Sequence, residues 1–457
     1  MSATFAPELM AQWSQGHWSK TPTHTIHGFG TDTRTLGAGD AFVAIKTERR
    51  DGHNYLSEAQ QRGAACALVS KLIANDLPQL VVDDPQAGLR RIAAGWRQQF
   101  KGTVIGVTGS VGKTSTKDLL GALLGPSAFI TEANLNNLIG VPLMLLRLDH
   151  AKHRFAVIEA GMSVPGELKI SAEVMRPNLA IVTAVAPVHL AGVESLAGVA
   201  REKSQLVAAL TTSGKAIMPA SLLAWPDFKA FAAQTFAVQF EGEAAPAVKP
   251  ARLISASLHS QGAQRVLTLD GEAYVLAAIS DGLARNAALA IVAAKEVGVS
   301  VAVIREALVR WLPPLGRGRV HALADQTFYI DCYNSSPASL IDAAQCFDRL
   351  SAADARPRLF VLGGMAELGA QSAALHRECG AHLPLRAGDE VVGWSGDVAE
   401  LLAGIKVAGV KKVLASSHAE VADIISRHHG YIFVKGSRAG ALERVLPAHL
   451  QTQISFH

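Results

Sequence analysis

The sequence predicts an α/β protein of three domains, in which a central parallel-sheet domain stands between two smaller α/β domains. The first reason is length, because 457 residues that are 49% apolar exceed one ordinary domain. The second is that short apolar runs alternate with helical stretches, a pattern typical of parallel sheets covered by helices. The third is a glycine-rich turn between an apolar run and a helix, within residues 104–115.

The first domain is predicted to cover residues 1–98. Apolar runs predict its strands at 41–45, 66–69 and 80–82, and helical patterns predict helices at 56–62 and 85–100.

The central domain is predicted to cover residues 99–314 and to contain the glycine-rich turn. Its strands are expected at 103–107, 155–159 and 179–185, followed by a β-rich stretch at 236–275 and an alanine-rich helix at 286–297. Two prolines and two glycines within 313–318 predict a hinge after it.

The third domain, residues 315–457, alternates again and predicts a Rossmann-like sheet without a G-x-G-x-x-G turn. Strands are expected at 328–331, 358–363, 390–393 and 431–435. Helices are expected at 337–350, 371–383 and 439–449.

The run from Val104 to Ser115 has the order that a phosphate-binding loop requires. Glycines let backbone N–H groups converge on phosphate oxygens, a lysine reaches the outer phosphates, and a threonine hydroxyl can ligate Mg²⁺. Val107 stands where the strict pattern has its first glycine, so an ordinary glycine-rich turn is the alternative. We expect the nucleotide phosphates at Gly109, Ser110, Val111, Gly112, Lys113, Thr114 and Ser115.

Polar residues follow the other strands of the central domain. Glu159 ends one apolar strand and His189 follows the next, so both are expected at the carboxyl edge where parallel sheets bind ligands. Glu159 is a candidate Mg²⁺ ligand, and a solvated strand-end glutamate is the equal alternative. Alone, His189 is more typical of a hydrogen-bonded loop residue, and Lys203 of an exposed helix lysine.

Two further clusters carry polar side chains. Asn134, Asn136 and Asn137 precede a helix, where amides at this density suit recognition of amide or carboxylate groups. A turn with an asparagine cap explains them equally well. Asp331 ends a strand of the third domain, a position from which acidic residues accept hydrogen bonds from a ribose.

Composition argues against several classes of protein. The net charge is only +4 and no basic stripe accompanies it, so we expect no nucleic-acid partner. The four cysteines lack C-x-x-C spacing, which favours a reduced, cytoplasmic protein over a disulfide scaffold or a zinc site. We see no signal peptide and no stretch suited to stable membrane insertion, and we expect a monomer.

Together, these and other segments resemble the Mur ligase family, and above all the members that add D-alanyl-D-alanine to UDP-N-acetylmuramoyl-tripeptide. The resemblance covers nearly the whole chain, and the family's phosphate loop places its glycines as here. It is carried by the loop and by Thr31–Arg34, Gly39–Ala44, Arg50–His53, Asn134–Pro142, Met365–Gly369 with His376, and Lys435–Arg438.

The resemblance implies ATP-dependent amide ligation through an acyl phosphate, and it assigns roles. Lys113 would hold the ATP phosphates, Mg²⁺ would lie among Thr114, Glu159 and His189, and Lys203 would be carbamylated to act as a further metal ligand. The other nucleotide contacts would be Asn286, Arg319, Asp331, Tyr333 and Asn334. The UDP-muramoyl-peptide and the dipeptide would be bound by Thr33, Arg34, Asp51, His53, Asn134, Asn136, Asn137, Lys435, Ser437 and Arg438.

Several positions depart from the family pattern. They are Thr47, Ala191, Ser336, Gly364 and the stretch 281–285, which lacks the expected His-Asn doublet before Asn286. These departures leave two alternatives open. One is a Mur-type ligase with a different acceptor, and the other is an ATP-binding regulator that has lost ligation.

Overall fold

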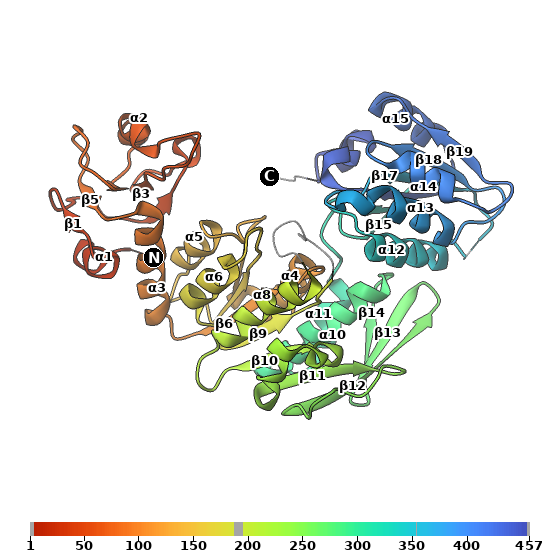
Figure 1. The fold of residues 1–457 in the computed structure, drawn as a ribbon, viewed down its shortest axis with the longest axis horizontal. Coiled ribbons are helices and arrows are strands. Elements are labelled where there is room, and N and C mark those ends of the chain that lie inside the picture. Colours follow the sequence, from red (N-terminus) through yellow and green to blue (C-terminus); the bar gives the residue numbers. More distant parts are fainter. Residues whose placement is uncertain (1–3, 187–194, 353, 455–457) are drawn as a thin grey trace. The chain divides into compact units, whose positions relative to one another are not determined.

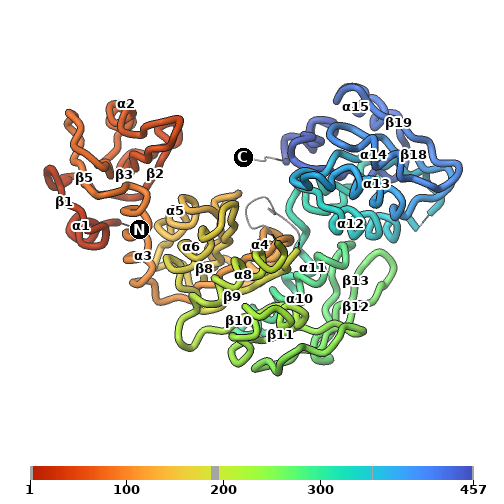
Figure 2. The backbone as a smooth tube through the Cα atoms, viewed as in Figure 1, coloured from red at the N-terminus to blue at the C-terminus, as the bar shows by residue number. Residues whose placement is uncertain are grey.

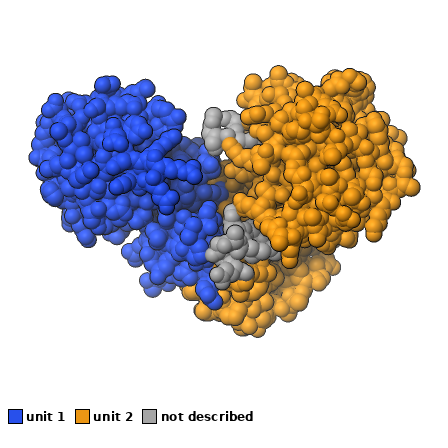
Figure 3. Space-filling view, turned by 45° about the horizontal axis from the view of Figure 1, so that its top comes forward, with its two compact units in different colours: residues 1–109, 124–182, 200–216 blue, residues 110–123, 183–199, 217–457 orange. Residues whose placement is uncertain are grey.

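A computed structural model describes residues 4–186, 195–352 and 354–454. The chain folds into two compact units (Figure 3). Unit 1 comprises Met1–Gly109, Leu124–Val182 and Ala200–Ala216, and unit 2 comprises Ser110–Leu123, Thr183–Val199 and Ile217–His457. In the described chain, no helix has the length and apolar character needed to cross a membrane.

Unit 1 begins with a five-stranded sheet in the order β1-β5-β4-β3-β2 (Figure 1). The strands β2 to β5 are parallel, and β1 pairs with β5 in the antiparallel sense. The predicted strands are confirmed as β3, β4 and β5, whereas β1 and β2 were not predicted. The bounds are β1 His17–Trp18, β2 Gly28–Gly30, β3 Asp40–Val43, β4 Cys66–Val69 and β5 Gln79–Val81.

Helices of this region follow local sequence signals. The helix α2 spans Leu56–Gln61, close to its predicted bounds. The predicted helix at 85–100 is confirmed as α3, Pro85–Gln99, with proline in its first turn and Asp84 as its cap. The Asp84 carboxylate accepts from the backbone N–H of Gln86 at 2.9 Å, which satisfies one of the donors that a helix start leaves open.

The rest of unit 1 contains four parallel strands in the order β9-β6-β8-β7. Their bounds are β6 Thr103–Thr108, β7 Ala128–Ile130, β8 Phe155–Glu159 and β9 Leu179–Val182, so the predicted strand at 179–185 is shorter than expected. Val107 and Glu159 are partners in the register of β6 and β8. The carboxyl ends of these two strands therefore meet at one edge, as predicted.

Three helices of the central region matter for the site. The helix α5 spans Gly140–Leu146 and α6 spans Glu167–Met175, and both contact α3 in unit 1. The helix α8, Leu196–Ala208, carries Lys203. The strand β10, Lys215–Pro219, includes the point where the chain passes from unit 1 to unit 2.

The predicted β-rich stretch is confirmed in unit 2 as β11 to β14. The strand β11 is parallel to β12, and the pairs β12–β13 and β13–β14 are antiparallel. Two helices, α10 at Asp281–Glu296 and α11 at Val301–Arg310, contact these strands. The helix α10 begins earlier than predicted because the Ser280 hydroxyl caps it. The strand bounds are Thr235–Phe240, Arg252–Gln261, Gln264–Leu269 and Glu272–Leu276.

The C-terminal part of unit 2 is a six-stranded sheet in the order β15-β16-β20-β17-β18-β19. All neighbours are parallel except β15 and β16. The four predicted strands are confirmed, and β15 and β19 were not predicted. The bounds are β15 Arg319–Leu323, β16 Gln326–Asp331, β17 Arg358–Gly363, β18 Glu390–Trp394, β19 Lys411–Leu414 and β20 Tyr431–Lys435.

Helices cover both faces of this sheet (Figures 1 and 2). Neighbouring residues along β16 point to opposite cores, because Tyr329 belongs to one and Phe328 to the other. The first core includes residues of α12 (Pro337–Leu350), α13 (Ser372–His382) and α14 (Val398–Gly404). The second includes residues of α15 (His418–Arg427) and α16 (Ala448–Gln451). This is the doubly wound arrangement expected from the alternating sequence.

The predicted helix at 439–449 is wrong. The chain instead forms two short 3₁₀ turns, Arg438–Gly440 and Leu442–Val445, before α16. Ala441, between the turns, has φ of 46°, and Pro447 lacks the N–H that a continuous helix would need. The apolar spacing correctly predicted that side chains of this segment are buried, but it wrongly predicted a continuous helix.

Candidate active site

The predicted phosphate loop joins β6 to α4, Lys113–Leu124. Gly109 has φ of 148° and Gly112 has φ of 85°, conformations that favour glycine. The loop is tied to the chain that follows β9, since the Ser110 N–H donates to the Ala184 carbonyl at 2.9 Å. The Thr183 hydroxyl also donates to the Val111 carbonyl at 2.5 Å. The backbone of the loop is therefore fixed by hydrogen bonds on its flank.

Asn286 lies against this loop. A Cβ atom at Gly112 would come within 2.0 Å of the Asn286 side-chain nitrogen, so only glycine fits under this amide. Asn286 comes from α10, far along the chain, and both residues were predicted to contact the nucleotide. The structure brings them together.

Arg317 contacts the start of α4. Its Nη2 lies 3.5 Å from the Thr114 hydroxyl, and its guanidinium lies 3.5 Å from the centre of the Tyr333 ring. The sequence reasoning missed Arg317 and placed it only in a hinge. Its sequence surroundings, a Gly-Arg-Gly run after two prolines, gave no signal of this contact.

The predicted residues of the C-terminal sheet form one cluster at the carboxyl ends of β16 and β20. Asp331 and Lys435 are register partners, and the Lys435 ammonium lies 2.6 Å from the Asp331 carboxylate. Lys435 also donates to the Asn334 carbonyl at 3.0 Å and is 1% exposed. The Arg438 guanidinium lies 5.7 Å from the Tyr333 ring centre, so the cluster extends toward Arg317.

Two other predicted residues of this region lie apart from that ion pair. Ser437 is buried, and its backbone N–H donates to the Gly364 carbonyl at 3.2 Å. Arg319 lies on β15, where its Nε is buried without a hydrogen-bond partner among the described residues. In the structure it is Arg317, two positions earlier, that reaches Thr114.

Glu159 is buried at the end of β8, with 1% exposure. Its Oε1 accepts a hydrogen bond from the Asn136 amide at 2.7 Å. Its Oε2 is buried and has no hydrogen-bond partner in the described part of the chain. A buried carboxylate oxygen without a donor is costly, and a hard divalent cation would satisfy it. The Glu159 carboxylate therefore fits the predicted metal ion.

The three predicted asparagines have different surroundings. The side chain of Asn137 accepts from the backbone N–H groups of Ile139, at 3.1 Å, and Gly140, at 2.8 Å, so it caps the start of α5. Asn136 holds Glu159, and Asn134 is exposed. The sequence left recognition and capping open, and capping is correct for Asn137.

The remaining predicted metal ligands are Lys203 and His189. Lys203 is 1% exposed, so it is not the exposed helix lysine that its pattern alone suggested. His189 lies outside the described residues, as does Ala191. Across the described ranges, no three His, Cys, Asp or Glu side chains gather in a way that could hold a metal. Among the predicted metal ligands, Glu159 is the one acidic side chain that the structure describes.

The predicted uridine-sugar residues lie in unit 1. The Ser70 N–H donates to Nε2 of His53 at 3.0 Å, so the other ring nitrogen, Nδ1, carries the proton toward Asp51 at 2.6 Å. This hydrogen bond lowers the pKa of Asp51. His53 and Thr33 are buried, whereas the Arg34 side chain is 77% exposed and pairs with Asp32.

Ser70 was missed by the sequence reasoning. It is exposed at the carboxyl end of β4, and its hydroxyl lies 3.1 Å from Nε2 of His53. The strand-end rule that identified Glu159 would have found it, since Ser70 directly follows an apolar strand.

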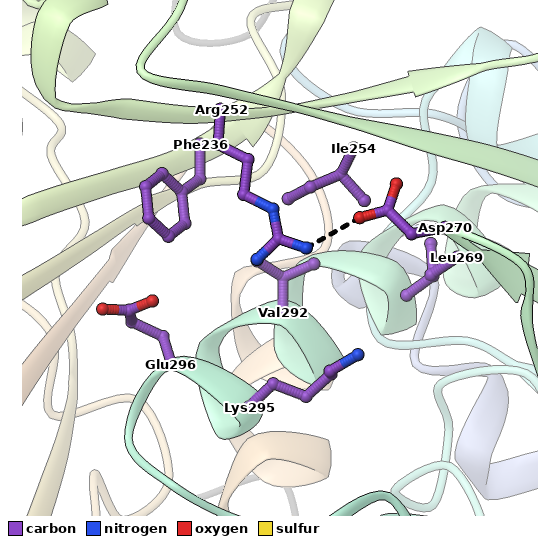
Figure 4. A pocket seen from close by; sticks show the side chains of 8 residues that line it. All are labelled: Phe236, Arg252, Ile254, Leu269, Asp270, Val292, Lys295 and Glu296. Atoms are coloured by element: carbon purple, nitrogen blue, oxygen red, sulfur yellow. Dashed lines mark hydrogen bonds and ion pairs between the residues drawn. The ribbon is translucent and has the colours of Figure 1, made fainter.

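A pocket in unit 2 lies elsewhere, between β11–β13 and α10 (Figure 4). The described residues that line it include none of the predicted site residues. Arg252 at its wall pairs with Asp270 at 2.8 Å, and Lys295 pairs with Glu272 on β14. We do not assign this pocket to the active site.

Comparisons with known proteins agree with this geometry. The family model "Mur ligase middle domain" matches residues 107–294, and "Mur ligase family, catalytic domain" matches residues 25–95. The first range begins at the phosphate loop and ends within α10. It therefore includes Glu159, Lys203 and Asn286.

Curated relatives match over nearly the full length. The UDP-N-acetylmuramoyl-tripeptide–D-alanyl-D-alanine ligase of Escherichia coli is 34% identical over 433 residues, which cover 93% of this chain and 94% of the relative. The ligase of the same name from Bacillus subtilis is 27% identical, with 94% of each chain covered.

Solved structures show the same fold. MurF from Acinetobacter baumannii superposes with a TM-score of 0.84 at 28% identity, covering 99% of both chains. MurF from Thermotoga maritima, crystallised with ADP, gives a TM-score of 0.77 at 23% identity over 93% of this chain and 97% of that one, a likeness of fold. With a 34% identical relative covered almost end to end, this chain belongs to the Mur ligase family.

Proposed function

We propose that this chain is an ATP-dependent peptide ligase that joins D-alanyl-D-alanine to UDP-N-acetylmuramoyl-tripeptide, in the synthesis of peptidoglycan precursors. The observation that carries this proposal is the full-length match to relatives that bear this activity as their name. The phosphate loop with Asn286 against Gly112, and the buried acid Glu159 at a strand end, supply the chemistry that such a ligase needs.

The reaction couples two displacements. The terminal carboxylate of the tripeptide attacks the γ-phosphorus of ATP, and ADP leaves with the bonding electron pair. The amine of the dipeptide then attacks the carbonyl carbon of the acyl phosphate, inorganic phosphate leaves, and the amine loses a proton. Lys113 at the start of α4 would neutralise charge on the transferring phosphoryl group, together with N–H groups of the loop.

A divalent cation would assist this phosphoryl transfer by neutralising phosphate charge. Glu159 would hold it through its unpartnered Oε2, and we assign Thr114 and His189 to the same site because the family resemblance does. We also propose that ATP reaches Asn286, Asp331, Tyr333 and Asn334.

Lys203 would hold the same cation as a carbamate. An ammonium beside a divalent cation would be repelled by it. Reaction of the neutral amine with CO₂ releases a proton and gives a carbamate, whose two oxygens suit a hard cation. This assignment rests on the family resemblance.

We assign the uridine-sugar end of the substrate to residues 1–98, with Arg34, Asp51 and His53 contributing to its site. His53 is buried beneath Ser70, so it would act by holding this exposed serine rather than by direct contact. The ranges 99–314 and 315–457 would bind ATP and the dipeptide, with Lys435, Ser437 and Arg438 near the latter. The nucleotide substrates favour a cytoplasmic location, and we propose a monomer.

The decisive experiment measures phosphate release with ATP, Mg²⁺ and UDP-N-acetylmuramoyl-tripeptide, with and without D-alanyl-D-alanine. We expect phosphate release only when the tripeptide and the dipeptide are both present, because an acyl phosphate formed without an acceptor would be wasted by hydrolysis. Equal release without the dipeptide would instead favour the ligation-deficient regulator. Release with another amino acid or dipeptide, but not with D-alanyl-D-alanine, would favour a Mur-type ligase with a different acceptor.

A further inference from the structure

The amide of Asn136 and the carboxylate of Glu159 form a contact that neither the resemblance nor the comparisons assign. The Asn136 side chain donates to Oε1 of Glu159 at 2.7 Å, across 23 residues of sequence. Of the two Glu159 carboxylate oxygens, this leaves Oε2 buried and without a partner among the described residues. The amide thus determines which oxygen is left for another ligand.

The backbone of Asn136 is itself fixed by two hydrogen bonds. The Asn136 carbonyl accepts from the Gly161 N–H at 2.8 Å, and the Asn136 N–H donates to the Asn134 carbonyl at 2.7 Å. A Cβ atom at Gly161 would lie 3.3 Å from the Asn136 side-chain oxygen, closer than most such contacts. The loop of Asn136 is therefore joined to the chain just after β8, on which Glu159 lies.

The backbone of Glu159 is fixed from a second direction. Its N–H donates to the Thr131 hydroxyl at 2.9 Å, and Thr131 is fully buried. Because its main chain and one carboxylate oxygen are both hydrogen-bonded, the Glu159 side chain has little freedom to rotate. Such rigid support is what metal-binding carboxylates usually receive from a hydrogen-bonding neighbour.

We propose that Asn136 is a positioning residue of the ligase, which orients Glu159 so that Oε2 is available to the divalent cation. This inference rests on the function proposed above. It departs from the sequence-based interpretation, in which Asn136 contacts the substrate. The neutral amide suits the role, because it fixes the carboxylate without cancelling the negative charge that attracts the cation.

The test compares metal affinity in wild-type protein and Asn136→Ala, with Mn²⁺ as the probe and ADP present, followed by electron paramagnetic resonance. Loss of such a supporting hydrogen bond typically weakens metal binding about 10- to 100-fold, and we expect a shift of this size. In turnover assays the Mg²⁺ concentration for half-maximal rate should rise, whereas KM for the tripeptide and dipeptide substrates should change little.

Two further variants separate positioning from folding. Asn137→Ala removes the cap of α5 and should lower the unfolding temperature without changing Mn²⁺ affinity. Asn136→Ser keeps a small polar group that is too short to reach Glu159, so it should weaken Mn²⁺ binding as alanine does. It also provides the result if Asn136→Ala fails to fold.

Unchanged Mn²⁺ affinity in a folded Asn136 variant would overturn the proposal. Unchanged affinity together with a raised KM for either carbon substrate would restore the substrate-contact interpretation. Because Mn²⁺ binding is measured without the tripeptide or dipeptide, the result stands apart from the ligase assay. Failure of wild-type protein to ligate would therefore count against the proposed function and not against this one.

Discussion

Glu159 on β8 and Asp331 on β16 are carboxylates at the ends of parallel strands, yet their surroundings are opposite. Glu159 accepts from a neutral amide, and its second oxygen is buried without a partner among the described residues. Asp331 faces the ammonium of Lys435 at 2.6 Å on the neighbouring strand. The first site has negative charge to offer a cation, whereas in the second this charge is already neutralised.

The difference comes from the residue that the sheet register places beside each acid. Lys435 stands opposite Asp331 on β20, whereas the register partner of Glu159 on β6 is the apolar Val107. A strand-end acid therefore becomes a candidate metal ligand only when no cation lies opposite it.

Glu159→Gln should cause the largest loss of activity. The substitution keeps the shape of the side chain and removes the charge that we assign to the cation. Loss of a transition-state charge contact typically costs about 3–4 kcal/mol, or roughly two to three decades in turnover rate. Phosphate release measures this loss, and thermal unfolding should change little. A variant with normal turnover but reduced stability would mean that Glu159 has a structural role only.

Lys203→Ala should also be nearly inactive, but a short carboxylic acid added in solution should restore part of the activity. The acid would replace the carbamate oxygens that we assign to the metal site. Wild-type activity should fall in CO₂-depleted buffer and return with bicarbonate. Full activity of Lys203→Ala would show that the buried lysine has a purely structural role, and Glu159 would then lack this partner.

Lys435→Met should lower the stability of the fold as well as the affinity for the dipeptide, near which we place Lys435. It leaves the Asp331 carboxylate without its ion pair, and breaking a buried pair costs on the order of 3 kcal/mol. The low end of the usual cost of breaking a buried ion pair applies, because 19% of the Asp331 side chain is exposed. Chemical denaturation measures the loss, and Lys435→Met combined with Asp331→Asn should recover much of it. No recovery in the double variant would show that Lys435 stabilises the sheet in another way.

Much of the fold could be predicted from the sequence because the parallel strands are short, apolar and separated by clear helices. The runs that became β8, β17 and β20 are buried along almost their whole length, so their patterns were unambiguous. The helix expected at 439–449 failed because backbone conformation at Ala441 and Pro447 overrides apolar spacing. The edge strand β1 has only two residues, and β19 begins with two lysines and is largely exposed, so neither gives an apolar run.

The sequence identified individual residues of the site, but not which of them contact one another. The sequence indicated Asp331 and Lys435 separately, yet they are 104 residues apart, and only the register of β16 and β20 joins them. Arg317 was missed because its importance comes from Thr114, which is 203 residues away in the sequence. Asn136 was expected to contact substrate because no local pattern reveals that its amide reaches Glu159.

Asp32 and Arg34 provide the smallest and most exposed case of a paired acid. The hydrogen bond from Arg34 is the main cause that lowers the pKa of Asp32 to about 2. Because the folded-state pKa is below the unfolded value of about 3.9, the pair stabilises the fold above that value. This contribution should decrease as the pH falls toward about 2. The Arg34 side chain is 77% exposed, so solvent screening keeps the effect small. The difference in unfolding free energy between wild-type protein and Asp32→Asn should be small at pH 6, vanish at low pH and shrink in high salt. A difference that persists at low pH would show that the carboxylate charge is not its source, and that this pair does not belong with Asp331 and Lys435.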